Sequence, residues 1–110
     1  RISLEEGSGG SIVRGFAVSN NNPRDPWGSA IDVVGVRDVL IENCELSSSA
    51  NDETILNLHS GCLATVRKNT IRGGQAHGVT GISVHATAIA TICDNSICDN
   101  DVGVRLPPSA

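Results

Sequence analysis

The segment from Ile82 to Ile97, ISVHATAIATICDNSI, repeats the pattern of LNLHSGCLATVRKNTI, which runs from Leu56 to Ile71. Both segments begin with an apolar-polar-apolar unit followed by His, continue through small residues, and end in apolar-x-x-Asn-x-Ile. The offset between equivalent positions is constant from the first residue of the segment to the last. Self-similarity at a fixed period of roughly 20 to 50 residues is the signature of a solenoid, in which each repeat stacks on the next. This period therefore constrains the fold more than any other feature of the chain.

Two earlier copies extend the period toward the N-terminus. The four apolar anchors of the repeat are Val13, Ile41, Val66 and Ile92, and the step between them varies little. A second apolar residue follows each anchor five positions later, at Val18, Leu46, Ile71 and Ile97. An apolar-x-apolar unit stands ten positions before each of the last three anchors, at 31–33, 56–58 and 82–84, with partial copies at 2–4 and 104–106.

Each repeat contains only short β-type runs and turn residues, with β-branched residues at most of the anchors. The signature of leucine-rich repeats and their helical segment are both missing. The chain has only two aromatic residues, Phe16 and Trp27, so its core consists of small aliphatic side chains, which suit repetitive stacking. We therefore predict an all-β fold, a right-handed parallel β-helix (solenoid) of about four to five coils, with a repeat of about 25 to about 28 residues. Residues 1–110 are expected to form one β-helix domain, with a C-terminal tail at 107–110.

The phrases GISV…ATICDNSI and SIVRGFAV resemble the repeats of the pectate-lyase-like right-handed β-helix superfamily, over roughly residues 2 to 106. This resemblance implies an internal asparagine ladder at the turn between the second and third strands of each coil. Asn69 and Asn95 match that position, and Asn43 matches it with a slip of one residue, since Cys44 stands in its column. Stacked amide side chains can satisfy one another in a core. The alternative is that these residues are simply turn-favouring asparagines.

The resemblance also implies a function, because proteins of this superfamily bind acidic or neutral polysaccharides on the first sheet and its rim. They include lyases, hydrolases and epimerases that act on uronic-acid chains, and such repeat proteins are often extracellular. We therefore expect a carbohydrate-interacting protein whose partner is a polysaccharide or oligosaccharide. The alternative is a non-enzymatic structural or interaction solenoid. The compartment and the presence of any activity stay open.

Alternation along the first strand of each coil predicts which side chains share its outward face. One outward column consists of Asp32, Asn57, Ser83 and Arg105, of which the last three are candidate substrate-binding residues. A second column, one pleat further along, consists of Val34, His59 and His85. Parallel strands lie about 4.8 Å apart, so His59 and His85 should be neighbours. For Arg105, closing the last coil is an alternative to binding substrate.

The loops that precede this sheet vary in length and add further polar residues to its rim. They are expected at 19–30, 47–54, 72–81 and 98–103. Function usually sits on such loops when a rigid scaffold holds them. Their candidate substrate-binding residues are Trp27, Asp52, Glu53 and His77. Trp27 would stack on a sugar ring or, alternatively, fold over the edge of a coil.

Three groups of residues could carry chemistry. Asp32, His59 and His85 offer a carboxylate and two imidazoles for acid/base catalysis. Asp32 with Asp52 or Glu53 would make a carboxylate pair for glycoside hydrolysis. Asp99 and Asp101 could bind calcium, which takes oxygen ligands. The sequence indicates no other cofactor. Neither the paired-Asp signature of polygalacturonase-like hydrolases nor the DPHD-type motif of alginate epimerases is present. The alternatives to a catalytic role are that the repeated histidines are incidental and that Asp32 is a solvated carboxylate on a strand.

Other classes of protein fit poorly. The formal net charge of −4 argues against nucleic-acid binding, which needs a basic stripe. No apolar run approaches the roughly 20 residues that span a bilayer. The four cysteines fit no common zinc signature and are predicted to be small residues in strands, although a disulfide is possible. The opening RISLEE and the Pro-containing end RLPPSA lead us to expect a homo-oligomer or a piece of a longer chain, with a partial cap at the C-terminal end.

Overall fold

The computed structural model describes residues 2–4, 10–20, 29–48, 54–59, 61–73, 78–98, 100 and 102–106. These residues form thirteen strands and no helix: β1 (Ile2–Leu4), β2 (Ile12–Arg14), β3 (Ala17–Asn20), β4 (Ile31–Val33), β5 (Val39–Glu42), β6 (Glu45–Ser48), β7 (Thr54–Leu58), β8 (Leu63–Arg67), β9 (Thr70–Arg72), β10 (Thr80–Val84), β11 (Ile89–Cys93), β12 (Ser96–Cys98) and β13 (Val102–Arg105). The described part therefore holds no helix that could cross a bilayer.

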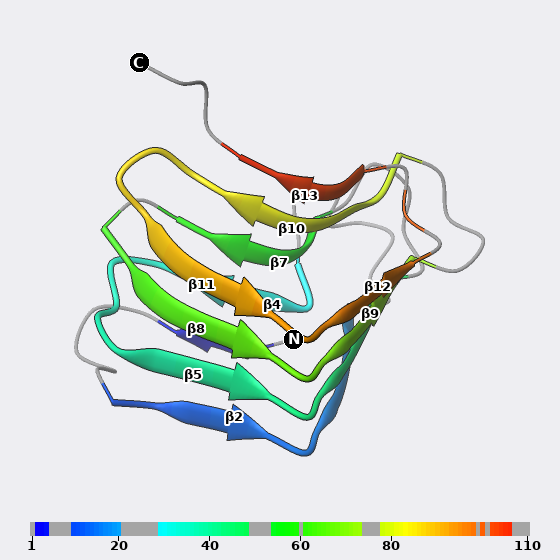
Figure 1. Ribbon diagram of the computed structural model, residues 1–110, viewed down its shortest axis with the longest axis horizontal. Helices are drawn as coiled ribbons and strands as arrows, with labels where there is room; N and C mark the ends of the chain where they lie inside the picture. Colours follow the sequence, from blue (N-terminus) through cyan, green and yellow to red (C-terminus); the bar gives the residue numbers. More distant parts are fainter. Residues whose placement is uncertain are drawn as a thin grey trace.

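The strands form three parallel sheets that together make a β-helix (Figure 1). The first sheet has the order β1-β4-β7-β10-β13, the second β11-β8-β5-β2 and the third β12-β9-β6-β3. Each coil contributes one strand to each sheet, giving four coils followed by β13. Both the all-β class and the coil architecture that the repeat predicted are confirmed.

The register of the sheets reproduces the columns read from the sequence. The four anchors pair directly, Val13 with Ile41, Ile41 with Val66, and Val66 with Ile92. The residues five positions later pair in the same way in the third sheet. One period of the sequence thus corresponds to one step along the axis of the solenoid.

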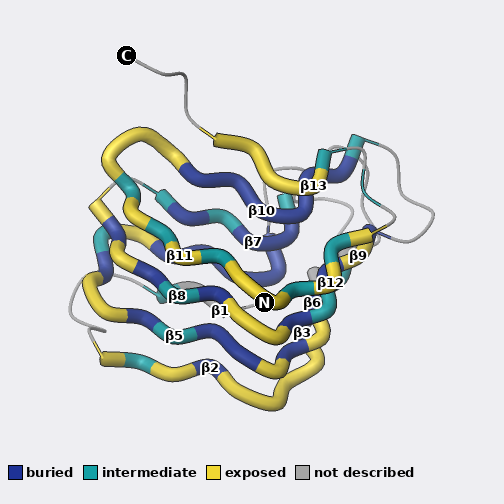
Figure 2. Tube along the Cα trace, viewed as in Figure 1, coloured by how far each residue is buried: buried dark blue, intermediate teal, exposed yellow. Residues whose placement is uncertain are grey.

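The core lies inside the coils and consists almost wholly of aliphatic side chains. Its largest fully buried members are Ile31, Ile41, Leu46, Ile55, Leu56, Leu58, Ile71, Ile82, Val33, Val36 and Val66. Burial falls off toward the C-terminal end, where Ile92 and Ile97 are only partly buried against this core (Figure 2). The middle coils are buried best because a coil covers them on each side.

At the bend between the second and third sheets, two successive positions have different requirements: a positive φ angle at the first and, in the middle coils, a buried side chain at the second. At the first position, Gly15, Asn43, Lys68 and Asp94 all have positive φ angles, of 75°, 55°, 57° and 56°. Glycine adopts this conformation freely, and Asn and Asp tolerate it better than other side chains. At the second position, Asn69 is buried and Asn95 is half-buried.

Amide hydrogen bonds connect this second position from coil to coil. The Asn69 side chain donates to Oδ1 of Asn95 and to the carbonyl oxygen of Ile41, each at 3.0 Å. Its own Oδ1 accepts the backbone N–H of Cys44 at 3.0 Å. The placement of Asn43 in this column was wrong: Asn43 is exposed at the positive-φ position, and the buried thiol of Cys44 occupies the column.

The loops that were predicted at 19–30, 47–54 and 72–81 are shorter than expected. Strand β3 continues to Asn20, β6 to Ser48, and β10 begins at Thr80. The polar ends of β3 and β6 and the Thr-Gly start of β10 consist of residue types typical of loops. In a parallel sheet their backbone groups are paired all the same, because the next coil supplies partners whatever the side chain. The tail at 107–110 lies outside the described residues.

Candidate functional site

The first outward column is assembled by the pairing of β4, β7, β10 and β13. Asp32 pairs with Asn57, Asn57 with Ser83, and Ser83 with Arg105. Exposure differs along this column: Asp32 and Ser83 are buried, Asn57 is half-buried and Arg105 is exposed. The alternative interpretation of Asp32 as a solvated carboxylate is therefore wrong, because its side chain is only 8% exposed.

His59 and His85 are stacked neighbours, as the repeat predicted. Their ring centroids lie 4.9 Å apart and the ring planes differ by 13°. The backbone holds both residues in register, because His59 N–H donates to Val33 O at 2.8 Å and His85 N–H donates to Leu58 O at 2.9 Å. Each histidine thus stands at the end of a first-sheet strand, where the chain leaves for the second sheet.

Each imidazole also contacts the polar residue of the preceding coil. His59 Nε2 lies 3.3 Å from Asp32 Oδ1, and His85 Nε2 lies 2.6 Å from Asn57 Oδ1. An amide oxygen only accepts hydrogen bonds, so Nε2 of His85 is the donor in that pair. In neutral His85 the lone pair is then on Nδ1. We refer to Asp32, Asn57, His59 and His85 as the histidine site.

Electrostatics distinguish the two rings. Burial lowers the pKa of His85, and the positive charge that His59 can carry lowers it further. Protonated His59 would form an ion pair with the buried carboxylate of Asp32. The site therefore favours a neutral imidazole at His85 and places a carboxylate beside the ring of His59. Acid/base catalysis by two titratable groups requires that their surroundings differ in this way.

The two histidines stand at the ends of first-sheet strands, not at their beginnings. Strands β7 and β10 begin on the right of Figure 1 and end on its left, and His59 and His85 directly follow their last residues. Candidate rim residues Trp27, Asp52, Glu53 and His77 lie outside the described residues. The proposed carboxylate pair with Asp32 is therefore not placed, nor are Asp99 and Asp101.

No metal centre is formed by the residues that the structure describes, among which no three His, Cys, Asp or Glu side chains gather. All four cysteines are described and are free thiols: Cys44 and Cys62 are buried, and Cys93 and Cys98 are exposed. Burial raises the pKa of the Cys62 thiol, which keeps it protonated.

Two hollows were not predicted from the sequence. One, of about 350 Å³, lies at the bend between the first and second sheets and is lined by Arg37, Gly61, Cys62, Leu63, Thr87 and Ile89. We call it the Arg37 hollow. The other, of about 280 Å³, lies on the third sheet and is lined by residues of β3, β6 and β9. The sequence signal for the first was the pair Gly61 and Thr87, each two positions after a histidine.

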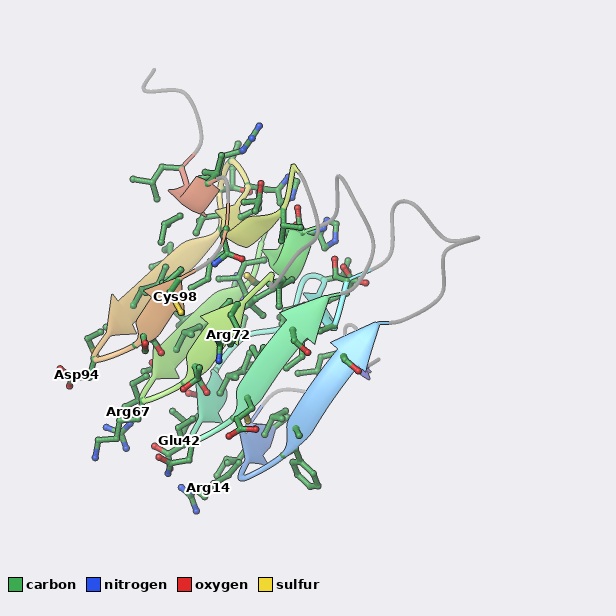
Figure 3. All side chains as sticks on the ribbon, turned by 90° about the vertical axis from the view of Figure 1, so that its right-hand side faces the viewer. Arg14, Glu42, Arg67, Arg72, Asp94 and Cys98 are labelled. Carbon is green, nitrogen blue, oxygen red and sulfur yellow. The ribbon has the colours of Figure 1, made fainter. Side chains whose placement is uncertain are left out.

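A charged ladder crosses the second sheet where it bends toward the third (Figure 3). Glu42 accepts hydrogen bonds from two arginines, Arg14 at 2.5 Å and Arg67 at 2.7 Å. These bonds lower the pKa of Glu42, the bond from Arg67 most, and the ion pairs hold three successive coils together. The two guanidinium groups are thereby compensated by a carboxylate.

The comparisons with known proteins agree with this architecture. A family model described as a right handed beta helix region matches residues 2–109. No curated protein and no solved structure matches the chain. The family match covers nearly every residue, and the described strands coil as that description states. The chain belongs to the right-handed β-helix family.

Proposed function

We propose that the outward face of the first sheet binds an acidic polysaccharide, with the histidine site along the edge at which its strands end. The observation that carries the proposal is the stacked pair His59–His85, whose Nε2 atoms are held by Asp32 and Asn57 in the preceding coils. These contacts fix both rings, so their outward edges are preorganised. Preorganised polar groups bind a ligand at a lower entropic cost than mobile ones do.

The same arrangement fits one reaction, the β-elimination of a uronate chain. Nδ1 of neutral His85 would take the proton from the carbon next to the carboxylate, and the C–O bond to the leaving sugar would break with formation of a C=C double bond. Protonated His59 would give its proton to the leaving oxygen. Electrons and protons balance without an oxidant or a hydrolytic water. The elimination needs one base and one acid, and His85 and His59 are the residues proposed for these two roles.

The test is binding of oligogalacturonate and oligomannuronate by calorimetry, together with the ultraviolet absorbance of an unsaturated product. The double substitution His59→Gln and His85→Gln should weaken binding about tenfold or more and abolish any product. Lys68→Gln, which changes an exposed charge at the opposite bend, should bind as the original protein does. If the double variant binds both oligomers with unchanged affinity, the histidine site is not the binding surface.

A second candidate is a non-enzymatic solenoid that self-associates through its ends. It is favoured by large apolar side chains exposed on end strands and their bends, Ile12 and Phe16 at one end and Ile89 and Leu106 at the other. Exposed apolar surface of this kind marks interaction sites. Light scattering over a range of concentrations should then show mass increasing with concentration, and Phe16→Ser should reduce that increase. A monomer at every concentration contradicts this second function.

A further inference from the structure

The Arg37 hollow lies beside the histidine site, around the first bend of the coils. Gly61 and Thr87 line the hollow, and each is only two positions after one of the stacked histidines. The bend is tightened by backbone bonds from Cys62 N–H to His59 O and from Ala88 N–H to His85 O. Only a short bend of the chain therefore separates each stacked histidine from a residue that lines the hollow.

Arg37 differs from the other described arginines near a sheet bend. Arg14 and Arg67 are both compensated by Glu42, and Arg72 has an interaction of its own. None of the ion pairs among the described residues involves Arg37, which is exposed. A guanidinium group offers five N–H donors in a planar fork that matches a carboxylate. Its charge is thus available to an anionic ligand.

The other walls of the hollow suit the ring of a sugar. Leu63 and Ile89 pair in register across β8 and β11, and both remain exposed, at 44% and 65%. Together they present a short apolar strip next to the hydroxyl of Thr87. The volume of about 350 Å³ is at the lower end of the range for small-molecule sites, roughly 300–1,000 Å³. An apolar strip with one cation and one hydroxyl is complementary to a single uronate unit.

We propose that the Arg37 hollow is a subsite for one uronate unit of the bound chain, with Arg37 holding the carboxylate and Leu63 and Ile89 packing against the sugar ring. The inference rests on the proposed function and deepens it, because it makes Arg37 the residue that distinguishes an acidic from a neutral polysaccharide. The histidine site then positions the neighbouring sugar, and the Arg37 hollow makes binding selective for a chain that carries carboxylates.

The experiment measures binding of an oligogalacturonate and of its fully methyl-esterified, neutral counterpart to four proteins by calorimetry. These are the unchanged chain, Arg37→Gln, Arg37→Lys, and Lys68→Gln as a charge-matched control. Arg37→Gln should lose about 10- to 100-fold in affinity for the acidic oligomer, as expected for charge-assisted hydrogen bonds, and keep its affinity for the neutral one. Arg37→Lys should recover part of the loss, and Lys68→Gln should change neither affinity.

If Arg37→Gln binds the acidic oligomer as tightly as the unchanged chain does, the subsite proposal is overturned. The proposed function is still upheld in that case if the double variant His59→Gln with His85→Gln weakens binding. An equal loss for the acidic and the neutral oligomer would also overturn it, since Arg37 would then not read the carboxylate. If the unchanged chain binds neither oligomer, the proposed function itself fails. Unfolding of each variant in urea shows that the folds are intact.

Discussion

At the scale of single residues, one bend shows how position decides what an asparagine does. Asn43 and Asn69 occur at the same turn of successive coils, yet the first is exposed with a φ of 55° and the second is buried with its amide fully engaged. The positive φ requires only a residue that tolerates that backbone conformation. The buried position requires one that can both donate and accept hydrogen bonds along the axis.

Asn69→Ala should therefore lower the free energy of unfolding by about 2–4 kcal/mol, because it leaves the buried Cys44 N–H and the Ile41 carbonyl without their partner. Asn43→Gly should change that free energy by no more than about 0.5 kcal/mol, as is usual for surface positions, since Gly15 serves at the equivalent point. Urea denaturation of both variants measures the difference. Similar losses in the two would show that the asparagines act only as turn residues.

Protonation of His85 gives a second prediction at this scale. Its pKa is lowered, so the unfolded chain binds the proton more readily than the folded chain does. The contribution of His85 to stability is fully present above the ordinary pKa of 6.5 and decreases as the pH falls from 6.5 through the lowered pKa. In His59→Gln the pKa of His85 should rise, but not fully, because burial is the larger cause and remains. Ring-proton chemical shifts followed by NMR across the acidic and neutral pH range report this pKa, and an unchanged value contradicts the coupling.

The stacked histidines could be predicted from the sequence, whereas the state of Asp32 could not. Register follows from the repeat, because a fixed period places equivalent residues on adjacent strands. Burial depends on what covers a side chain from elsewhere, and alternation along β4 says nothing of that. The same limit applies to Arg37, since a hollow arises from the absence of bulk at several positions that are far apart in the sequence.

At the scale of elements, the stability of each strand comes from its neighbours, since such short strands bury little by themselves. The pairing of β10 with β13 shows how closely two coils approach. Gly81 faces Gly103 there, between the pairs Thr80–Val102 and Ile82–Val104. A methyl group on Gly81 would lie 2.6 Å from the carbonyl oxygen of Gly103, and one on Gly103 would meet only Ile97, at 3.7 Å.

Gly81→Ala should accordingly force β13 away from β10 and lower the free energy of unfolding by about 1–3 kcal/mol, the usual cost of overpacking. Gly103→Ala is the matched control, because its added methyl group finds ordinary van der Waals distance. Urea denaturation gives the free energies, and the amide signals of residues 102–105 report the separation of the two strands. Equal stability of the two variants would refute the close approach.

At the scale of the whole molecule, a solenoid is held together by contacts between adjacent coils, so its stability varies along the axis. Equivalent backbone bonds in the third and fourth coils have nearly the same length: Thr70 N–H to Cys44 O at 2.9 Å, and Ser96 N–H to Asn69 O at 2.8 Å. Their surroundings differ, since Ile71 is fully buried and Ile97 is only partly so. The hydrogen bond is thus constant while the hydrophobic contribution declines toward the C-terminal end.

Hydrogen exchange can separate these two contributions. The amide of Thr70 should exchange only through global unfolding, and that of Ser96 through an opening confined to the last coil, with exchange at least about tenfold faster. Low concentrations of urea should accelerate exchange at Thr70 steeply and at Ser96 only weakly, because a local opening exposes little surface. Val66→Ala, at a fully buried anchor of the third coil, should accelerate exchange at Thr70 more than at Ser96. It lowers the free energy of global unfolding by about 2–3 kcal/mol, whereas an opening confined to the last coil leaves Val66 in the folded part. Equal protection of the two amides would mean that the described coils unfold as a single cooperative unit.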